Sequence, residues 1–106
     1  MEDHIVLKPL GQTFGVAVNG TVAALPSIPA GAIRATIQVE TQPIRATFDG
    51  LTTSVTVGVG YYMGTISTVA CHVIEGWDNI NRMRVRQNGS TASSINILYE
   101  GEGQPS

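Results

Sequence analysis

The chain is poor in cysteine and in charge. Cys71 is the one cysteine among 106 residues, which excludes an intrachain disulfide and a thiolate metal cluster. Lys, Arg, Asp and Glu make up 13% of the residues, about half the usual share. The surface must therefore consist largely of Thr, Ser, Asn, Gln and Gly. Such a surface costs less to desolvate than one rich in Lys and Glu, so it suits burial against other proteins.

Long apolar runs and a basic field are also missing. No apolar run approaches the roughly 20 residues of a membrane span, and the first residues are acidic, unlike a signal peptide. We therefore expect synthesis in the cytosol and no membrane partner. The formal net charge of −2 and the pI near 5.5 argue against nucleic acid as the main ligand.

A helical period is absent, and a strand period takes its place. The 12 glycines and 5 prolines would interrupt a helix, whereas apolar residues recur at every second position, as in strands with one buried face. The clearest strands are predicted at 33–39, 44–48, 82–86 and 95–99. Weaker strands are predicted at 5–8, 13–18, 20–24, 54–59 and 66–74, and at most a short turn at 75–79.

Turn signals separate these segments. Asn-Gly or Asp-Gly pairs stand at 19–20, 49–50 and 88–89, and such pairs supply the positive φ angles of tight hairpin turns. The pattern predicts an all-β fold, a β-sandwich or jelly-roll-like single domain over residues 1–100. We expect a possible N-terminal arm at 1–10, which could cover a strand edge, and a flexible tail at 101–106.

Few residues suggest chemistry. Cys71 and His72 are adjacent, but neighbouring residues of a strand point to opposite faces and cannot share a proton, so we expect a buried thiol and a surface histidine. Gly58, Gly60 and Gly64 match no phosphate-loop spacing and predict a bend or bulge. The acids are scattered, without carboxylate pairs or metal-ligand spacing. We predict that the protein is not an enzyme and has no catalytic residues, cofactor or metal.

Three arginines are candidate interface residues. Arg82, Arg84 and Arg86 alternate along one predicted strand and would share one face. Three guanidinium groups so close would repel one another without acidic or carbonyl partners. They either pair with acids of this chain or bind carboxylates of a neighbouring subunit in bidentate contacts.

Three aromatic residues form the second candidate group. Tyr61, Tyr62 and Trp77 lie in predicted loops, where aromatic side chains either anchor interfaces or cap a core. We expect the adjacent tyrosines to separate, one pointing inward and one outward. An outward tyrosine near Trp77 could alternatively hold a sugar.

Residues 29–58 carry a resemblance to a known class. They read PAGAIRATIQVETQPIRATFDGLTTSVTVG, which resembles small tailed-bacteriophage virion structural proteins. Members typically read ALIQ-E-x-x-x-(V/I)-R-(W/F)-R-x-D-G-x-x-P-T-x-x-x-G at this point. The resemblance covers about 30 of 106 residues, with a weaker match at 79–87 and 94–99. Ala46, Phe48 and Thr53 depart from the pattern.

The resemblance implies a binding role in a virion. The class has no catalytic residues, and it includes capsid decoration (cement) proteins that sit as trimers on the shell, as well as neck and tail components. We expect a homotrimeric capsid decoration protein whose partner is the major capsid protein, made in the host cytoplasm and located on the capsid surface of the virion. The alternatives are a neck, tail or fibre component, or a carbohydrate-binding module at the host surface that uses Tyr61, Tyr62 and Trp77.

Overall fold

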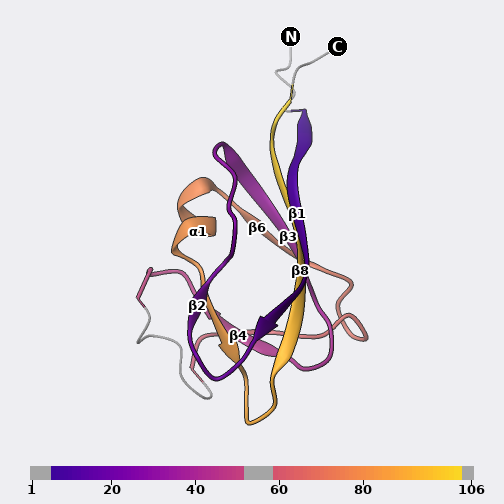
Figure 1. The fold of residues 1–106 in the computed structure, drawn as a ribbon, viewed down its shortest axis with the longest axis vertical. Coiled ribbons are helices and arrows are strands. Elements are labelled where there is room, and N and C mark those ends of the chain that lie inside the picture. Colours follow the sequence, from indigo (N-terminus) through magenta and orange to yellow (C-terminus); the bar gives the residue numbers. More distant parts are fainter. Residues whose placement is uncertain (1–5, 52–58, 104–106) are drawn as a thin grey trace.

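The computed structural model describes residues 6–51 and 59–103. These residues form strands β1 (Leu7–Val18), β2 (Ala23–Ala24), β3 (Ala32–Val39), β4 (Ile44–Thr47), β5 (Tyr61–Met63), β6 (His72–Glu75), β7 (Arg84–Gln87) and β8 (Ser93–Glu102), and helix α1 (Trp77–Arg82). Sheet A has the strand order β1-β8-β3-β6, and sheet B has the order β2-β7-β4-β5. All paired strands are antiparallel. The two sheets pack against each other (Figure 1), so the predicted all-β sandwich is confirmed.

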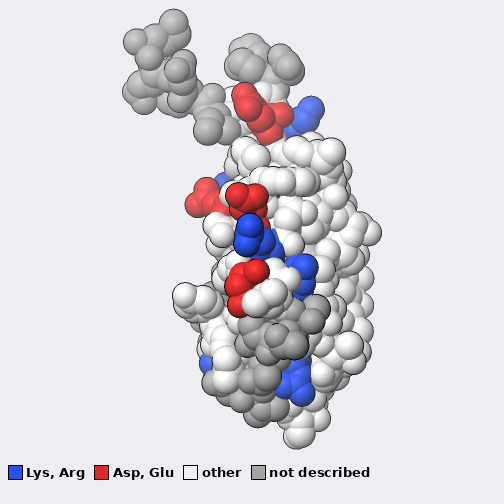
Figure 2. Space-filling view, turned by 90° about the vertical axis from the view of Figure 1, so that its left-hand side faces the viewer, with Lys and Arg blue, Asp and Glu red and all other residues white. Residues whose placement is uncertain are grey.

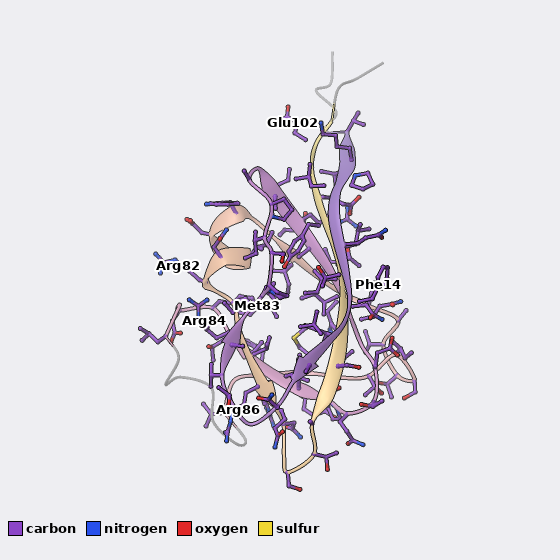
Figure 3. The ribbon with its side chains drawn as sticks, in the orientation of Figure 1. Phe14, Arg82, Met83, Arg84, Arg86 and Glu102 are labelled. Carbon is purple, nitrogen blue, oxygen red and sulfur yellow. The ribbon has the colours of Figure 1, made fainter. Side chains whose placement is uncertain are left out.

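The core lies between the sheets, because alternate side chains of each strand point inward. Ile37 and Ile97 from sheet A and Ile44 from sheet B are at most 2% exposed. Helix α1 adds Ile80, and Met83 follows directly after the helix; both are fully buried. Figure 3 shows Met83 pointing into the interior. One continuous apolar cluster therefore joins both sheets and the helix.

Tyr99 is the largest fully buried side chain. Its hydroxyl donates a hydrogen bond to the carbonyl oxygen of Pro26 at 2.6 Å, which ties strand β8 to the segment between β2 and β3. Burial raises the pKa of Tyr99 from 10.0 to about 12, because the interior disfavours the phenolate. The side chain thus combines a large apolar area with a satisfied polar end.

Several predicted strands need correction. The strands predicted at 5–8 and 13–18 merge into the single strand β1, which has irregularities at Pro9/Gly11 and Thr13/Val16 that let it follow β8. Strand β5 occupies part of the predicted glycine-rich bend, and only the end of the segment 66–74 is a strand. Within the predicted strand 54–59, residues 54–58 lie outside the described residues, and Val59 is not in a strand.

The Asn-Gly pairs do not form hairpin turns. Asn19-Gly20 connects β1 to β2, and Asn88-Gly89 connects β7 to β8; in both cases the chain crosses from one sheet to the other. Neither glycine has a positive φ, whereas Gly50 has a φ of 77°. Asn19 instead accepts a hydrogen bond from the backbone N–H of Thr21 at 2.8 Å. The Asn-Gly pairs mark the ends of strands, but the two strands on either side of each pair belong to different sheets and pair with other strands.

The predicted arm and tail also change at their boundaries. Strand β1 begins at Leu7, which pairs with Glu102 at the end of β8. The backbone N–H of Gly103 donates to the carbonyl oxygen of Val6. Residues 7–10 and 101–102 therefore belong to sheet A. The rest of the predicted arm and tail, at 1–5 and 104–106, lies outside the described residues.

Candidate protein-docking surfaces

The three predicted interface arginines do not share one strand. Arg82 lies in the last turn of helix α1, and Arg84 and Arg86 lie on β7. The strand predicted at 82–86 is present as β7 but begins two residues later, and where only a short turn was predicted at 75–79 the chain forms helix α1. Ile80 and Met83 are three residues apart and both fully buried, a spacing that a helical turn satisfies. The apolar alternation that predicted the strand therefore includes Arg82 and Met83, which precede β7.

Arg84 and Arg86 contact carbonyl oxygens of their own chain. Arg84 Nη1 donates to the carbonyls of Asn81 at 2.9 Å and Met83 at 3.0 Å. Arg86 Nε donates to the carbonyl of Gly20 at 2.9 Å. These acceptors carry no net charge, so the guanidinium groups are held in place without being neutralised.

Arg45 joins this face, although it was not among the candidates. It lies on β4 directly opposite Arg86 of β7 and opposite Tyr62 of β5. Its Nε donates to Asn88 Oδ1 at 2.6 Å, and its Nη1 donates to the carbonyl of Gly60 at 3.0 Å. The guanidinium carbon lies 5.3 Å from the centre of the Tyr62 ring, within range of a cation–π interaction. The alternation at 44–48 already placed Arg45 on an outward face.

We call Arg45, Arg84 and Arg86 the arginine face. All three point away from the core, since Ala46 and Val85 between them are buried. The strands of sheet B contain no Asp or Glu. In Figure 3, Arg84 and Arg86 lie on the opposite side of the molecule from Phe14. Figure 2 shows that acidic and basic side chains gather in a narrow band, while most of the visible surface is uncharged.

The two tyrosines point to opposite faces of sheet B, as predicted, but neither is buried. Tyr62 pairs with Arg45 on the outward side, and Tyr61 pairs with the buried Ala46. Tyr61 is nevertheless 70% exposed because β5 is an edge strand. Its ring lies 5.9 Å from that of Phe48. A tyrosine on the inward side of a short edge strand can thus remain at the surface.

Trp77 begins helix α1 and is 45% exposed. Within the described residues, no ring contact joins Trp77 to either tyrosine. Tyr61 instead lines a hollow of about 420 Å³ with Glu75 and Asn79, among others. The three predicted aromatic residues therefore do not form one continuous platform.

The outward side of sheet A has a charged row with Arg34, Glu75 and Glu100 and, next to it, an uncharged part. Register places Gln12, Leu98, Thr36 and Val73 in one row across the four strands. Phe14 stands beside this row and is 69% exposed. We call the uncharged surface made by these residues with Gln38 and Asn96 the neutral face. A groove of about 310 Å³ runs over it.

Phe14 is the functional candidate that sequence reasoning missed. The apolar alternation of 13–18 is broken at the irregularity between Thr13 and Val16, where Gly15 has a φ of 65°. The backbone N–H of Gly15 donates to Asn96 Oδ1 at 3.0 Å. This irregularity turns Phe14 away from the core. Gly15, next to Phe14, was the one feature of the sequence that could have indicated this irregularity.

Cys71 and His72 show a second correction. Cys71 is exposed and lines the groove of the neutral face, so the expected buried thiol was wrong. His72 is partly buried, with Nε2 2.9 Å from the carbonyl oxygen of Gly64. Among the described residues, no three His, Cys, Asp or Glu side chains gather where they could hold a metal ion. The same residues include no helix long and apolar enough to cross a membrane.

Comparisons with known proteins give no match. No protein-family model fits the chain, and neither the curated proteins nor the solved structures include one that matches it.

Proposed function

We propose that the chain is a phage capsid decoration protein that docks on the shell through its neutral face. The observation that carries the proposal is the exposure of Phe14, at 69%, at a groove that is lined by uncharged side chains. An exposed aromatic side chain beside a groove gains free energy when a partner covers it. The resemblance of residues 29–58 to small virion proteins supplies the class of partner.

The neutral face provides the parts of a docking surface. Fully burying an exposed Phe or Val side chain contributes about 1.5–3 kcal/mol; Phe14 is 69% and Val73 44% exposed, so each would contribute part of that amount. Gln12 and Gln38 border the groove and can form hydrogen bonds to a partner backbone. Arg34, Glu75 and Glu100 lie in the next row of the sheet, outside the neutral face, so covering the neutral face itself requires no ion to be desolvated. Such a face suits burial between protein subunits.

The mechanism is binding alone. A protein that engages assembled capsid subunits but not free ones stabilises the assembled shell by mass action. In a homotrimer, the equivalent contacts of three copies would raise the avidity. The proposed partner is the major capsid protein, and the proposed location is the capsid surface of the virion.

A neck, tail or fibre position is the closest alternative, because the same neutral face could dock there. The carbohydrate-binding alternative has less support, since Trp77 has no ring contact with Tyr61 or Tyr62 in the described part of the chain. Copy number in purified virions separates the positions: hundreds of copies support the shell, and a dozen or fewer contradict it.

A binding experiment tests the docking surface. We expect the protein to co-sediment with expanded empty capsids but not with free capsid subunits, and Phe14→Ser to weaken capsid binding by at least about tenfold. Tyr61→Ser is the matched control, because Tyr61 is 70% exposed but lies on sheet B. Equal binding by both variants would contradict the assignment of the neutral face. Sedimentation of the free protein as a monomer at micromolar concentration would contradict the trimer.

A further inference from the structure

We infer that the arginine face binds carboxylates of an acidic segment on a partner protein. The inference concerns sheet B, opposite the neutral face, and does not depend on the virion assignment. Arg45 and Arg86 are directly opposite each other on neighbouring antiparallel strands. Like charges at such positions repel and lower stability. A carboxylate bound to either guanidinium group would offset that repulsion.

The guanidinium groups are positioned before any partner arrives. Arg45 is fixed by Asn88 and Gly60, and Arg86 by the carbonyl of Gly20. These bonds use Nε of both residues and one terminal nitrogen of Arg45. Within the described residues, the hydrogen bonds leave Nη2 of Arg45 and both terminal nitrogens of Arg86 for another acceptor. Fixing the side chains in advance lowers the entropy cost of binding.

The distribution of charge favours an acidic partner. The arginine face holds three of the six basic residues, so three basic and eight acidic residues remain for the other parts of the chain. Carboxylates fit a guanidinium group in a planar, bidentate arrangement. The Tyr62 ring lies over the Arg45 guanidinium group and covers part of it.

A protein carboxylate fits this face better than nucleic acid. Nucleic-acid binding depends on many phosphate contacts and on a basic domain, whereas this chain has a pI near 5.5. Three arginines on two neighbouring strands match one or two carboxylates in an acidic loop. The docking of such a loop would be specific in position and sensitive to salt.

The test uses a fluorescent poly-L-glutamate chain of about 20 residues as the probe, with the intact protein at low ionic strength. We expect Arg45→Gln/Arg86→Gln to weaken binding about tenfold. The control Lys8→Gln/Arg82→Gln removes the same charge from sheet A and helix α1 and should change binding less than about twofold. Equal loss in both double variants would overturn the inference, because it would show a response to net charge alone.

Single variants guard against a folding defect. Arg86→Gln removes one exposed hydrogen bond and should keep the wild-type melting temperature while weakening probe binding. Arg86→Lys keeps the charge but loses the bidentate fork, so we expect intermediate binding. Tighter binding to a single-stranded oligonucleotide of equal charge, or no binding to poly-L-glutamate at millimolar concentration, would overturn the inference. Self-association that Arg86→Gln abolishes would place the carboxylates on a second copy and overturn a separate partner.

Discussion

Sheet A and sheet B share one core but present different chemistry to solvent. Inside, Ile37 of sheet A and Ile44 of sheet B are both fully buried. Outside, sheet A carries the uncharged neutral face next to a charged row that contains Glu75 and the Arg34–Glu100 ion pair, whereas the strands of sheet B carry the arginine face and no acidic residue. Folding requires the inward pattern of both sheets but neither outward pattern. The difference between the outward sides therefore marks the surfaces where partner recognition is expected.

The largest test of this comparison removes core volume from each sheet. Ile37→Ala and Ile44→Ala should each lower the free energy of unfolding by about 2–5 kcal/mol, because each leaves a cavity. Phe14→Ala, at a side chain that is 69% exposed, should change it by less than about 0.5 kcal/mol. Urea denaturation measures all three. If Phe14→Ala cost as much as the core variants, the neutral face would be part of the folding core.

A second test compares close backbone approaches in the two sheets. A Cβ at Gly60, next to strand β5, would lie 2.9 Å from the carbonyl oxygen of Ala46, and Gly60 has a φ of 106°. A Cβ at Gly101 in β8 would lie 2.8 Å from the carbonyl oxygen of Gly31. Alanine at either position should destabilise the protein by about 1–3 kcal/mol, with Gly60→Ala the larger effect.

Gly89→Ala is the control for this pair. Nothing lies within 4 Å of a Cβ at Gly89, so thermal denaturation should show little change. If the variants at positions 60 and 101 matched this control, the two sheets would lie less closely against their neighbouring segments than the structure shows.

The smallest expected effect concerns Tyr99, a polar group inside sheet A. Tyr99→Phe leaves the Pro26 carbonyl without its donor and should cost about 1–2 kcal/mol. Because the pKa of Tyr99 is raised from 10.0 to about 12, its neutral form stabilises the fold below pH 10. This contribution declines as the pH rises from 10 toward 12.

Two measurements check the role of Tyr99. Absorbance at about 295 nm should show a tyrosine that ionises near pH 12, and this step should vanish in Tyr99→Phe. Urea denaturation should show that wild-type stability falls between pH 10 and 12 more steeply than that of the variant. Parallel curves for the two proteins would contradict the burial of the hydroxyl.

The sequence predicted most strands whose apolar residues alternate without interruption. Strands β3, β4 and β8 agree with the predicted segments because each has one fully buried face. The prediction from the sequence failed where the strand period gives way to the short helix α1. Helix α1 contains two asparagines whose side chains donate to carbonyls four residues earlier, and it has only two apolar residues, Trp77 and Ile80, three positions apart. A six-residue helix is too short to show its own period.

The candidate surfaces were only partly predictable, because they depend on register between distant strands. Arg45 and Arg86 are 41 positions apart in the sequence and become neighbours through the pairing of β4 with β7. Arg82, two positions from Arg84, is separated from that pair by the end of the helix. Phe14 reaches the neutral face because of a local irregularity in β1. The alternation of apolar residues predicts which face of a sheet a residue lies on, but the pairing of strands determines which residues lie beside it.

The pairing of Leu7 with Glu102 brings the start of β1 beside the end of β8 (Figure 1). A cargo fused near either end of this domain would emerge from the same pole, away from the loop at Asn88-Gly89. Both broad flanks of the sandwich would stay accessible. The geometry therefore suits the domain for display, since a passenger protein could be added at either end while the neutral face and the arginine face stay exposed.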